Sequence, residues 1–506
     1  MNRRDFLHRA AAGGALLTMP AIFGGCGMQP AEVLREPPPD NPFLDWFGVD
    51  QSAIRQALSA LTAQGADLAD LYFQHTRTSS IAYEEGAISH AESKIEQGVG
   101  LRVIAGDHNA FAFTEELSQE SILEAARTAS AAAGGIAATV PRPFHSVDPG
   151  NLYSVAVPWS AVGLDLKTPL FEFVEQHAKG LEPAVEKVSL QWLDADERIL
   201  IATHDGRLVT DRRPMSRIAV VVTAKKGQQV QSGFASIAAR DGLEWYSEER
   251  LSGMVQEAVD RAMVLFDARR PPVGEMPVIL AAGTSGVLLH EAIGHAFEAD
   301  FNRDGVSPYA GGIGSKVAES FVSVVDQSTI PNERGALNVD DEGSATGRTV
   351  LVEDGVLNSY LHDRVSARHF DAETTGSARR ESFRFAPMPR MSCTFIENGP
   401  HTREEIIASV DRGVLCETYM DGQVQLGEGD YTFNVRNGWL VEKGKITAPL
   451  KNFTISGNGP DLLKGITMVA NDSKLDAGGW TCGKKGQNVP VSHGMPTVLA
   501  TGINLS

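Results

Sequence analysis

The segment LLHEAIGHAFEAD constrains the fold of this chain most, because it brings His290, Glu291 and His295 close together in the sequence. Two imidazoles and a carboxylate are typical of a hydrolytic zinc site, where the imidazoles bind the ion and the carboxylate takes a proton from water. The more common pattern separates the two histidines by four residues on one helical turn. Here the separation is five, which sets the side chains roughly 140° apart on a regular helix. The helix must therefore be distorted between them.

The flanking residues indicate where this distortion lies. VILAAGTSGVLLHEAIGHAF is typical of a strand, a turn and then an apolar helix. We predict a helix that begins near Ser285 or Gly286 and carries a π-bulge or kink at Ala292 to Gly294, where the glycine would ease the strain. The alternative is a chance match on a buried helix. That alternative would leave its polar side chains unsatisfied, at a cost of several kcal/mol.

The surroundings of the four cysteines differ. Cys26 lies near the N-terminus, whereas Cys393 and Cys416 have apolar neighbours at alternate positions, as buried strand thiols do. Cys482 lies in GGWTCGKKGQ, where the glycines let the backbone approach an ion and the lysines favour the thiolate. Cys482 is therefore a candidate third metal ligand, and a loop cysteine without a role is the alternative. A disulfide between Cys393 and Cys416 stays open.

Other residues are also candidates for the third ligand, namely Glu298, Asp300 and His493. Glu298 and Asp300 directly follow the predicted helix. We expect them to orient the imidazoles, with surface carboxylates as the alternative.

Two further stretches carry possible binding chemistry. The glycine-rich residues 302–316 lack a GK[ST] ending and follow a helix, which favours a mobile loop near the site over a nucleotide site. The second stretch contains several arginines close together. Such a run is typical of a solvated edge, and the alternative is that it binds a substrate carboxylate. This run comprises Arg379, Arg380, Arg384 and Arg390.

Composition limits the class of protein and partner. With 506 residues and 42% hydrophobic content, the chain is long enough for two or more globular domains. A formal net charge of −19 lacks the cationic footprint of nucleic-acid binding, so we expect no nucleic-acid partner.

The N-terminal residues suggest export. Arg3 and Arg4 precede an apolar stretch too short to span a bilayer, and together they resemble a twin-arginine signal. The residues FGGC resemble a lipobox in which Cys26 would carry a lipid anchor, with ordinary signal cleavage as the alternative. We therefore expect a signal at 1–25 and a Pro-rich tether at 26–50. The protein would lie on the periplasmic or cell-envelope side.

Periodicity predicts an α+β protein. Pro271-Pro272 ends the last amphipathic helix of the first half and marks a boundary there. We expect an N-terminal α+β domain at 51–271 and a mostly β C-terminal domain at 272–506 that bears the metal-binding helix. Helices are predicted at 52–65, 118–135, 168–182 and 248–270, and strands at 69–78, 81–86, 98–106, 109–114 and in series over 188–236 with Asp-Gly and Lys-Gly turns.

These motifs together resemble the TldD/PmbA family of metallopeptidases. The resemblance rests on residues 95–114, HEAIGHAFEAD at 290–300 and CGKKGQNVPVSHGMPTV at 482–498, and it extends from about residue 50 to the C-terminus. It implies that His290, His295 and Cys482 bind Zn²⁺ and that Glu291 is the general base. One subtype of the family keeps the metal motif and the other lacks it. This chain keeps every motif residue and so resembles the active, TldD-like subtype.

The resemblance implies a zinc-dependent peptidase that cleaves extended or unfolded peptides held beside a strand edge. It also implies a dimer, either with a second copy or with a PmbA-like relative. A thiolate ligand donates charge to the ion and weakens it as a Lewis acid, so we expect modest turnover. The alternatives are a catalytically weak, peptide-binding partner subunit, which the intact motif disfavours, and a metal hydrolase of a non-peptide substrate.

Overall fold

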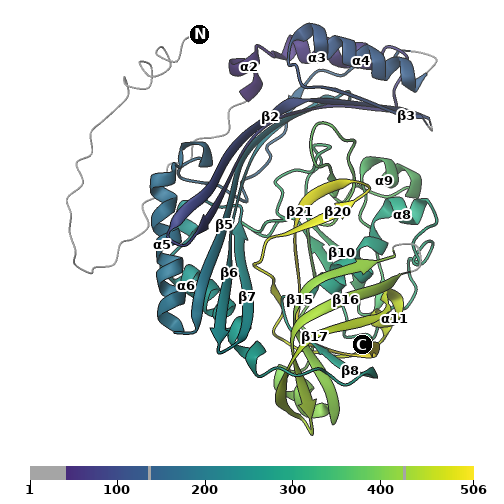
Figure 1. The fold of residues 1–506 in the computed structure, drawn as a ribbon. Helices are drawn as coiled ribbons and strands as arrows, with labels where there is room; N and C mark the ends of the chain where they lie inside the picture. The colour runs from purple at the N-terminus through teal and green to yellow at the C-terminus, as the bar shows by residue number, and fades with distance from the viewer. Residues whose placement is uncertain (1–40, 107, 135–137, 426–428) are drawn as a thin grey trace, which may run out of the picture. The chain divides into compact units, whose positions relative to one another are not determined.

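A long, mostly antiparallel sheet forms the first half of the fold (Figure 1). The structure is a computed structural model, and it describes residues 41–106, 108–134, 138–425 and 429–506. The strand order is β3-β2-β1-β5-β6-β4, with β7 on the free side of β6. The strands are β1 (Leu68–Glu84), β2 (Ala87–Ala105), β3 (His108–Thr114), β4 (His145–Ser146), β5 (Val185–Thr203), β6 (Arg207–Lys226) and β7 (Gln229–Ala239).

Two pairs of helices bury opposite ends of this sheet. Near one end, α3 (Gln51–Leu61) and α4 (Gln119–Ala133) pack on β1 to β3. Near the other end, α5 (Leu164–Leu181) and α6 (Glu248–Met263) pack on β5 to β7. The predicted helices are confirmed, and α4 has the expected Ser118 N-cap and a left-handed Gly134 after its last residue.

Part of the predicted tether belongs to this helical layer. Residues 42–47 form α2 (Pro42–Phe47), which begins at an Asn41 N-cap. The Phe43 side chain is fully buried, and its ring lies 5.6 Å from that of Phe73 on β1. The rest of the predicted tether, through residue 40, lies outside the described residues.

One predicted turn in the sheet is wrong. The polar residues between 78 and 81 do not separate two strands, because β1 runs unbroken from Leu68 to Glu84. Ser79 pairs with Ser93 of β2 on one side and with Asp194 of β5 on the other. Pairing on both edges satisfies the backbone, so the local turn preference of the polar residues is overridden.

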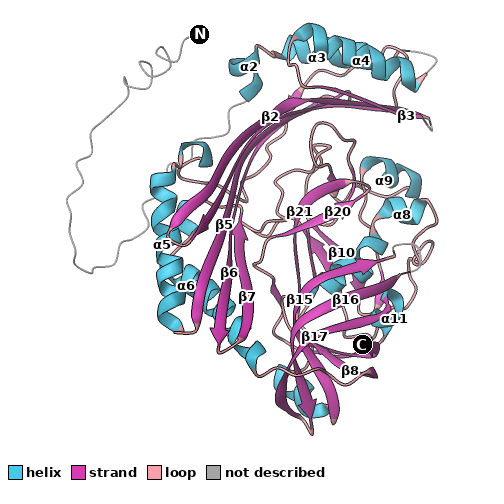
Figure 2. Cartoon of the chain, viewed as in Figure 1, coloured by secondary structure: helices cyan, strands magenta, loops and turns pink. Residues whose placement is uncertain are grey.

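The second half of the fold is mostly strands with short helices between them (Figure 2). One sheet has the order β11-β10-β9-β14-β21-β19 with β20 paired to β21, and another has the order β17-β16-β15-β8-β22-β18. The predicted α+β class, with a mostly β C-terminal part, is confirmed. The strands of the first of these sheets are β9 (Val324–Gln327), β10 (Arg348–Glu353), β11 (Val356–Leu357), β14 (Cys393–Ile396), β19 (Lys474–Leu475), β20 (Trp480–Lys484) and β21 (Gln487–Met495). The strands of the second are β8 (Gly274–Leu280), β15 (Arg412–Val424), β16 (Asp430–Glu442), β17 (Lys445–Asn458), β18 (Ile466–Val469) and β22 (Val498–Leu505).

The proline pair at 271 and 272 lies between α6 and β8, and the domain boundary placed there stays a prediction. Within the part of the chain that the structure describes, no helix has the length and apolar character needed to cross a membrane.

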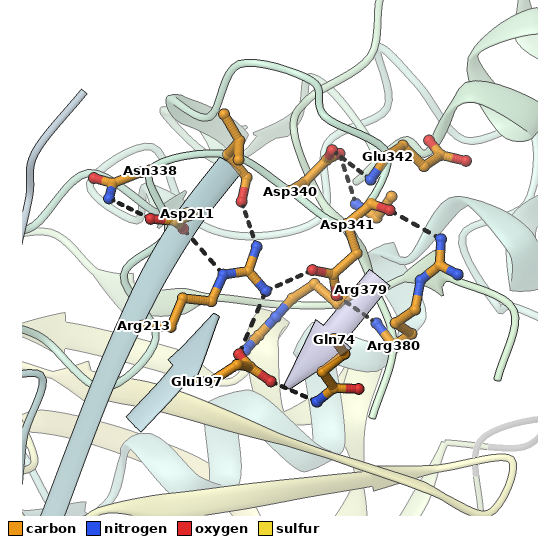
Figure 3. Close-up of polar contacts among 12 residues, drawn as sticks. Gln74, Glu197, Asp211, Arg213, Asn338, Asp340, Asp341, Glu342, Arg379 and Arg380 are labelled. Carbon is orange, nitrogen blue, oxygen red and sulfur yellow. Dashed lines mark hydrogen bonds and ion pairs between the residues drawn. The ribbon is translucent and has the colours of Figure 1, made fainter. Parts of the chain in front are cut away.

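Buried ion pairs join the two halves (Figure 3). Arg102 of β2 contacts Asp70 of β1 and Glu342 of a C-terminal loop, each at 2.6 Å. Arg213 of β6 contacts Asp341 of the same loop at 2.6 Å. All of these side chains are at most 4% exposed. Since a buried charge is tolerated only when it is paired, these contacts fix the C-terminal loop against the sheet.

The arginine run is not a solvated edge, so that prediction is wrong for most of its members. Arg379, Arg380 and Arg390 are buried, and only Arg384 is partly exposed, where it pairs with glutamates of the first half. Arg390 donates to the carbonyl oxygens of Cys482 (2.7 Å) and Gln487 (3.3 Å). It therefore holds together the hairpin formed by β20 and β21.

Candidate metal centre

The segment that carries the two histidines is a distorted helix, as predicted. It begins with α7 (Gly286–Leu288), continues as a π-helical turn η4 (Leu289–Ile293) and ends as a 3₁₀ turn η5 (Gly294–Phe297). The wider π turn takes up the extra residue between His290 and His295. The two imidazole rings consequently lie on one side, with ring centroids 5.1 Å apart.

Gly294 has a different role from the one predicted. Its φ of −62° is an ordinary helical value, so no conformational strain requires a glycine there. A Cβ at this position would instead overlap the Sδ atom of the fully buried Met391. The missing side chain therefore allows the metal-binding helix to pack closely against the segment that precedes β14.

The structure brings the three predicted ligands together. A ring nitrogen of His290, a ring nitrogen of His295 and the Sγ atom of Cys482 all lie within 4.8 Å of one another. Cys482 Sγ lies 3.3 Å from His295 Nε2. All three residues are at most 2% exposed. Cys482 reaches the histidines from β20, although it is distant in the sequence.

The chemistry of these donors fits a divalent metal ion. Both ring nitrogens of His290 are buried and have no hydrogen-bond partner among the described residues. An unsatisfied buried imidazole is costly, and an ion between the three donors would satisfy it. Burial alone would raise the pKa of the Cys482 thiol, but His290 and His295 lower it to about 4. The thiol is therefore a thiolate at neutral pH, which is the form that binds metals.

Glu291 lies at the open side of this cluster. Its carboxylate is 3.8 Å from His295 Nε2, and its side chain is 31% exposed while that of His295 is 2% exposed. A carboxylate in this position can exchange protons with water, and it is also close enough to contact a molecule that binds beside the three donors. Apart from His295, no described residue forms a hydrogen bond or an ion pair with the Glu291 carboxylate.

Glu298 supports the centre from behind, as predicted for a residue that orients an imidazole. Its carboxylate lies 2.8 Å from His295 Nδ1 and 2.9 Å from Lys484 Nζ, and all three side chains are buried. Burial alone would lower the pKa of His295, but Glu298 and Cys482 raise it. A carboxylate on Nδ1 fixes the ring orientation and leaves Nε2 to face the other donors.

The other proposed ligand candidates lie further out. Asp300 contacts Lys484 at 2.6 Å and Lys485 at 3.0 Å, so it joins the outer layer of charges. The His493 ring lies 5.9 Å from that of His290 and is not among the three clustered donors. Burial, with His290 nearby, lowers the pKa of His493 well below its usual value, which leaves it neutral. Lys484 is predicted to favour the Cys482 thiolate, but its Nζ atom pairs with Glu298 at 2.9 Å and with Asp300 at 2.6 Å. The sequence gives no signal for these two contacts.

The remaining candidate features have structural roles. Cys393 and Cys416 are both buried free thiols, so the open disulfide alternative is not formed. The glycine-rich stretch follows α8 (Ala299–Arg303) and packs on the metal-binding helix. Its Ser307 hydroxyl donates to the carbonyl of Ala296 at 2.7 Å.

An α+β fold with a buried His-His-Cys cluster beside a partly exposed glutamate fits the class of metal-dependent hydrolases. Comparison with known proteins narrows this class. Residues 69–133, 158–266 and 273–506 match, in turn, the models of PmbA/TldA metallopeptidase domain 1, the central domain and the C-terminal domain. The chain belongs to the TldD/PmbA family of metallopeptidases, and its cofactor is accordingly a metal.

Individual relatives agree with this assignment. A metalloprotease TldD homolog from Haemophilus influenzae is 36% identical over 467 residues, which cover 90% of this chain and 96% of the relative. A zinc metalloprotease TldD homolog from Saccharolobus solfataricus is 24% identical over 448 residues, covering 86% and 95%. The crystal structure of TldE from Thermococcus kodakarensis shares the fold with a TM-score of 0.68 at 18% identity, covering 87% and 97%.

The comparisons correct the prediction of a twin-arginine signal and a lipoprotein. The matched relatives are named as metalloproteases, and nothing in them indicates an export signal or a lipid on Cys26. Arg3, Arg4 and Cys26 lie outside the described residues. The short sequence patterns are too common to carry the assignment alone, so both features are withdrawn. The cell-envelope location stays a prediction.

Proposed function

We propose that this chain is a zinc-dependent peptidase that cleaves extended or unfolded peptides. The observation that carries the proposal is the convergence of His290, His295 and Cys482 within 4.8 Å, with Glu291 open to solvent beside them. Two imidazoles and one thiolate are borderline-soft donors that suit zinc, so His290, His295 and Cys482 would hold the ion. The name of the Saccharolobus solfataricus relative also supports zinc.

Zinc, Glu291 and Glu298 would have separate roles in peptide hydrolysis. When bound, zinc would supply Lewis acidity for the scissile carbonyl and for water. Glu291 accepts a proton from the attacking water and then delivers it to the leaving amine as the C–N bond breaks. Glu298 holds His295 in one orientation through Nδ1. Burial of the donors keeps the attacking water apart from bulk solvent.

Burial of the site also supports the choice of substrate. The three donors are at most 2% exposed, so a scissile bond must enter the fold to reach them. An extended segment can do so, whereas the surface of a folded domain cannot. Strand β20 does not offer a free edge to such a segment, because the carbonyl oxygens of Trp480 and Cys482 already accept hydrogen bonds from Arg334 and Arg390.

A second subunit is also part of the proposal. We propose a homodimer or a heterodimer with a PmbA-like relative. The fold that the chain shares with TldE supports this pairing. Mass determination of the purified chain by light scattering, alone and mixed with such a relative, tests it. A single chain in every sample would contradict the pairing.

The test of the enzyme combines metal analysis with peptide mapping. Wild type, Glu291→Gln, Cys482→Ser and the exposed-surface control Glu319→Gln are incubated with an unfolded protein, with and without chelator. Wild type and Glu319→Gln should bind one zinc per chain and release peptides. The chelator should abolish this release. Glu291→Gln should keep zinc and lose cleavage, and Cys482→Ser should lose both. Equal cleavage by wild type and Glu291→Gln would remove Glu291 from the mechanism, and zinc-free wild type would refute the metal site.

A further inference from the structure

A large cavity lies next to the candidate metal centre and has no role in the mechanism above. Its volume is about 790 Å³, which is within the range of small-ligand and peptide side-chain sites. Its wall includes Phe234 of β7, Thr284 at the start of the metal-binding helix and Tyr419 of β15. Trp480 and Thr481 complete the wall on the side of Cys482, the next residue of β20. The cavity therefore adjoins the donors through that strand.

The cavity is cationic although the chain as a whole is acidic. Four cations line it, Arg217, Arg261, Arg436 and Lys474, against two carboxylates, Glu257 and Asp476. Arg261 is already paired with Glu257 across one helical turn. No carboxylate lies within 4.0 Å of the other three cations in the described part of the chain.

The two unpaired arginines are held in place by neutral groups only. Arg217 donates to the Gly478 carbonyl at 3.0 Å and to the Ser236 hydroxyl at 3.2 Å. Arg436 donates to the carbonyl and hydroxyl of Ser232, and its buried Nε has no partner among the described residues. These guanidinium groups are oriented but not neutralised, so each retains donors for an anion.

One more arginine, Arg334, lies behind the wall of the cavity and makes the electrostatic potential in the cavity more positive. Arg334 is 8% exposed and donates to the Thr481 hydroxyl at 3.1 Å, while its buried Nη1 has no partner among the described residues. Burial, together with Arg240 and Arg217 nearby, lowers the pKa of Arg334 to about 9. Like charges at this density are costly, and an anion in the cavity would relieve them.

We propose that this cavity binds a carboxylate of the peptide substrate through Arg217, Arg436 and Lys474, and that the enzyme selects peptides by it. The inference depends on the proposed peptidase function. An extended chain advances about 3.3 Å per residue, so a carboxylate in the cavity belongs to a residue a few positions from the cleaved bond. An Asp or Glu side chain and a free C-terminus share this chemistry.

Binding of defined probes tests the inference separately from cleavage. The probes are labelled nonapeptides of mixed sequence with Glu or Gln at one position, each as a C-terminal acid and as an amide. The full-length, zinc-loaded Glu291→Gln protein holds them without turnover, and fluorescence anisotropy gives the affinity. Loss of one charge-assisted contact costs roughly 10- to 100-fold in affinity, so acidic probes should bind more tightly than neutral ones by that factor.

Variants in the same background assign the effect to the cavity. Arg436→Gln and the surface variant Lys474→Gln should each reduce the acid-over-neutral ratio at least threefold. Arg348→Gln, which removes a cation paired with Glu397 elsewhere on the surface, should retain the full ratio. The Glu/Gln and acid/amide comparisons distinguish a side chain from a C-terminus.

Two results would overturn the inference. One is equal affinity for acidic and neutral probes at every position, and the other is a preference that both cavity variants retain. Wild type that fails to cleave any peptide would instead refute the peptidase proposal, because the binding preference is measured without cleavage.

Discussion

Replacement of Glu298 by Gln gives the sharpest test of how the candidate metal centre is held. Glu298 is fully buried, and its carboxylate lies 2.8 Å from His295 Nδ1 and 2.9 Å from Lys484 Nζ. Glutamine has nearly the same shape and can still accept from Nδ1, but it carries no charge. Lys484 keeps Asp300 at 2.6 Å, so the substitution does not leave a buried cation alone. The fold should therefore survive while the orientation of His295 weakens.

The expected loss is in zinc affinity. Partners that hold a ligating histidine are worth about 10- to 100-fold in metal affinity. At about 1.4 kcal/mol per factor of ten, this range corresponds to roughly 1.4–2.8 kcal/mol. An independent estimate comes from a hydrogen bond to a charged group, which contributes about 1.5–3 kcal/mol. The two estimates overlap, so we expect the Kd for zinc to rise by one to two orders of magnitude.

The measurement is a competition titration of the metal-free protein against a chromophoric zinc chelator. Glu319→Gln is the matched control, because the same chemical change occurs there on an exposed side chain that is paired with Lys316. The melting temperatures of the metal-free proteins show whether the fold is retained. A Kd within twofold of wild type, with unchanged melting, would refute the role of Glu298.

Three further predictions concern stability and metal loss. Arg102→Met should lower the free energy of unfolding by about 3–5 kcal/mol, measured in urea, because Glu342 loses its buried cation; a loss under 1 kcal/mol would contradict this. Gly294→Ala should cost about 1–3 kcal/mol through overlap with Met391, and unchanged melting would show that the helix can shift freely. Chelator should lower the melting temperature of zinc-loaded wild type but not of Cys482→Ser, and equal shifts would place the metal elsewhere.

Local signals explain which elements of the fold could be predicted. The Ser118 cap and Gly134 stop of α4 are encoded within the helix ends, and Gly206 and Gly227 supply the positive φ of the tight turns. The continuity of β1 could not be predicted in the same way. It depends on β5, which pairs with Ser79 from far along the chain. A short polar stretch such as Ser79-Ser80 resembles a turn in the sequence until strands pair with it on both sides.

The site divides along the same line. The π turn follows from the spacing of His290 and His295 alone, because a regular helix cannot bring them together. Cys482 has only a suggestive local sequence, and its assignment needed the family resemblance. Lys484 pairs with Glu298 only because β20 returns to the metal-binding helix, and no spacing rule predicts that contact.

The net charge of a chain predicts its long-range attraction to a partner, but it does not predict the charge that lines a cavity. A formal charge of −19 opposes binding to nucleic acid, because that interaction samples the whole surface. Arg217 and Arg436 come from strands β6 and β16, and they reach one cavity only after the two halves of the fold meet. Their neighbours in sequence give no sign of this meeting. Cations held by carbonyls and hydroxyls in an acidic protein are not explained by solubility or by pairing, and a ligand carboxylate is the partner that their geometry still lacks.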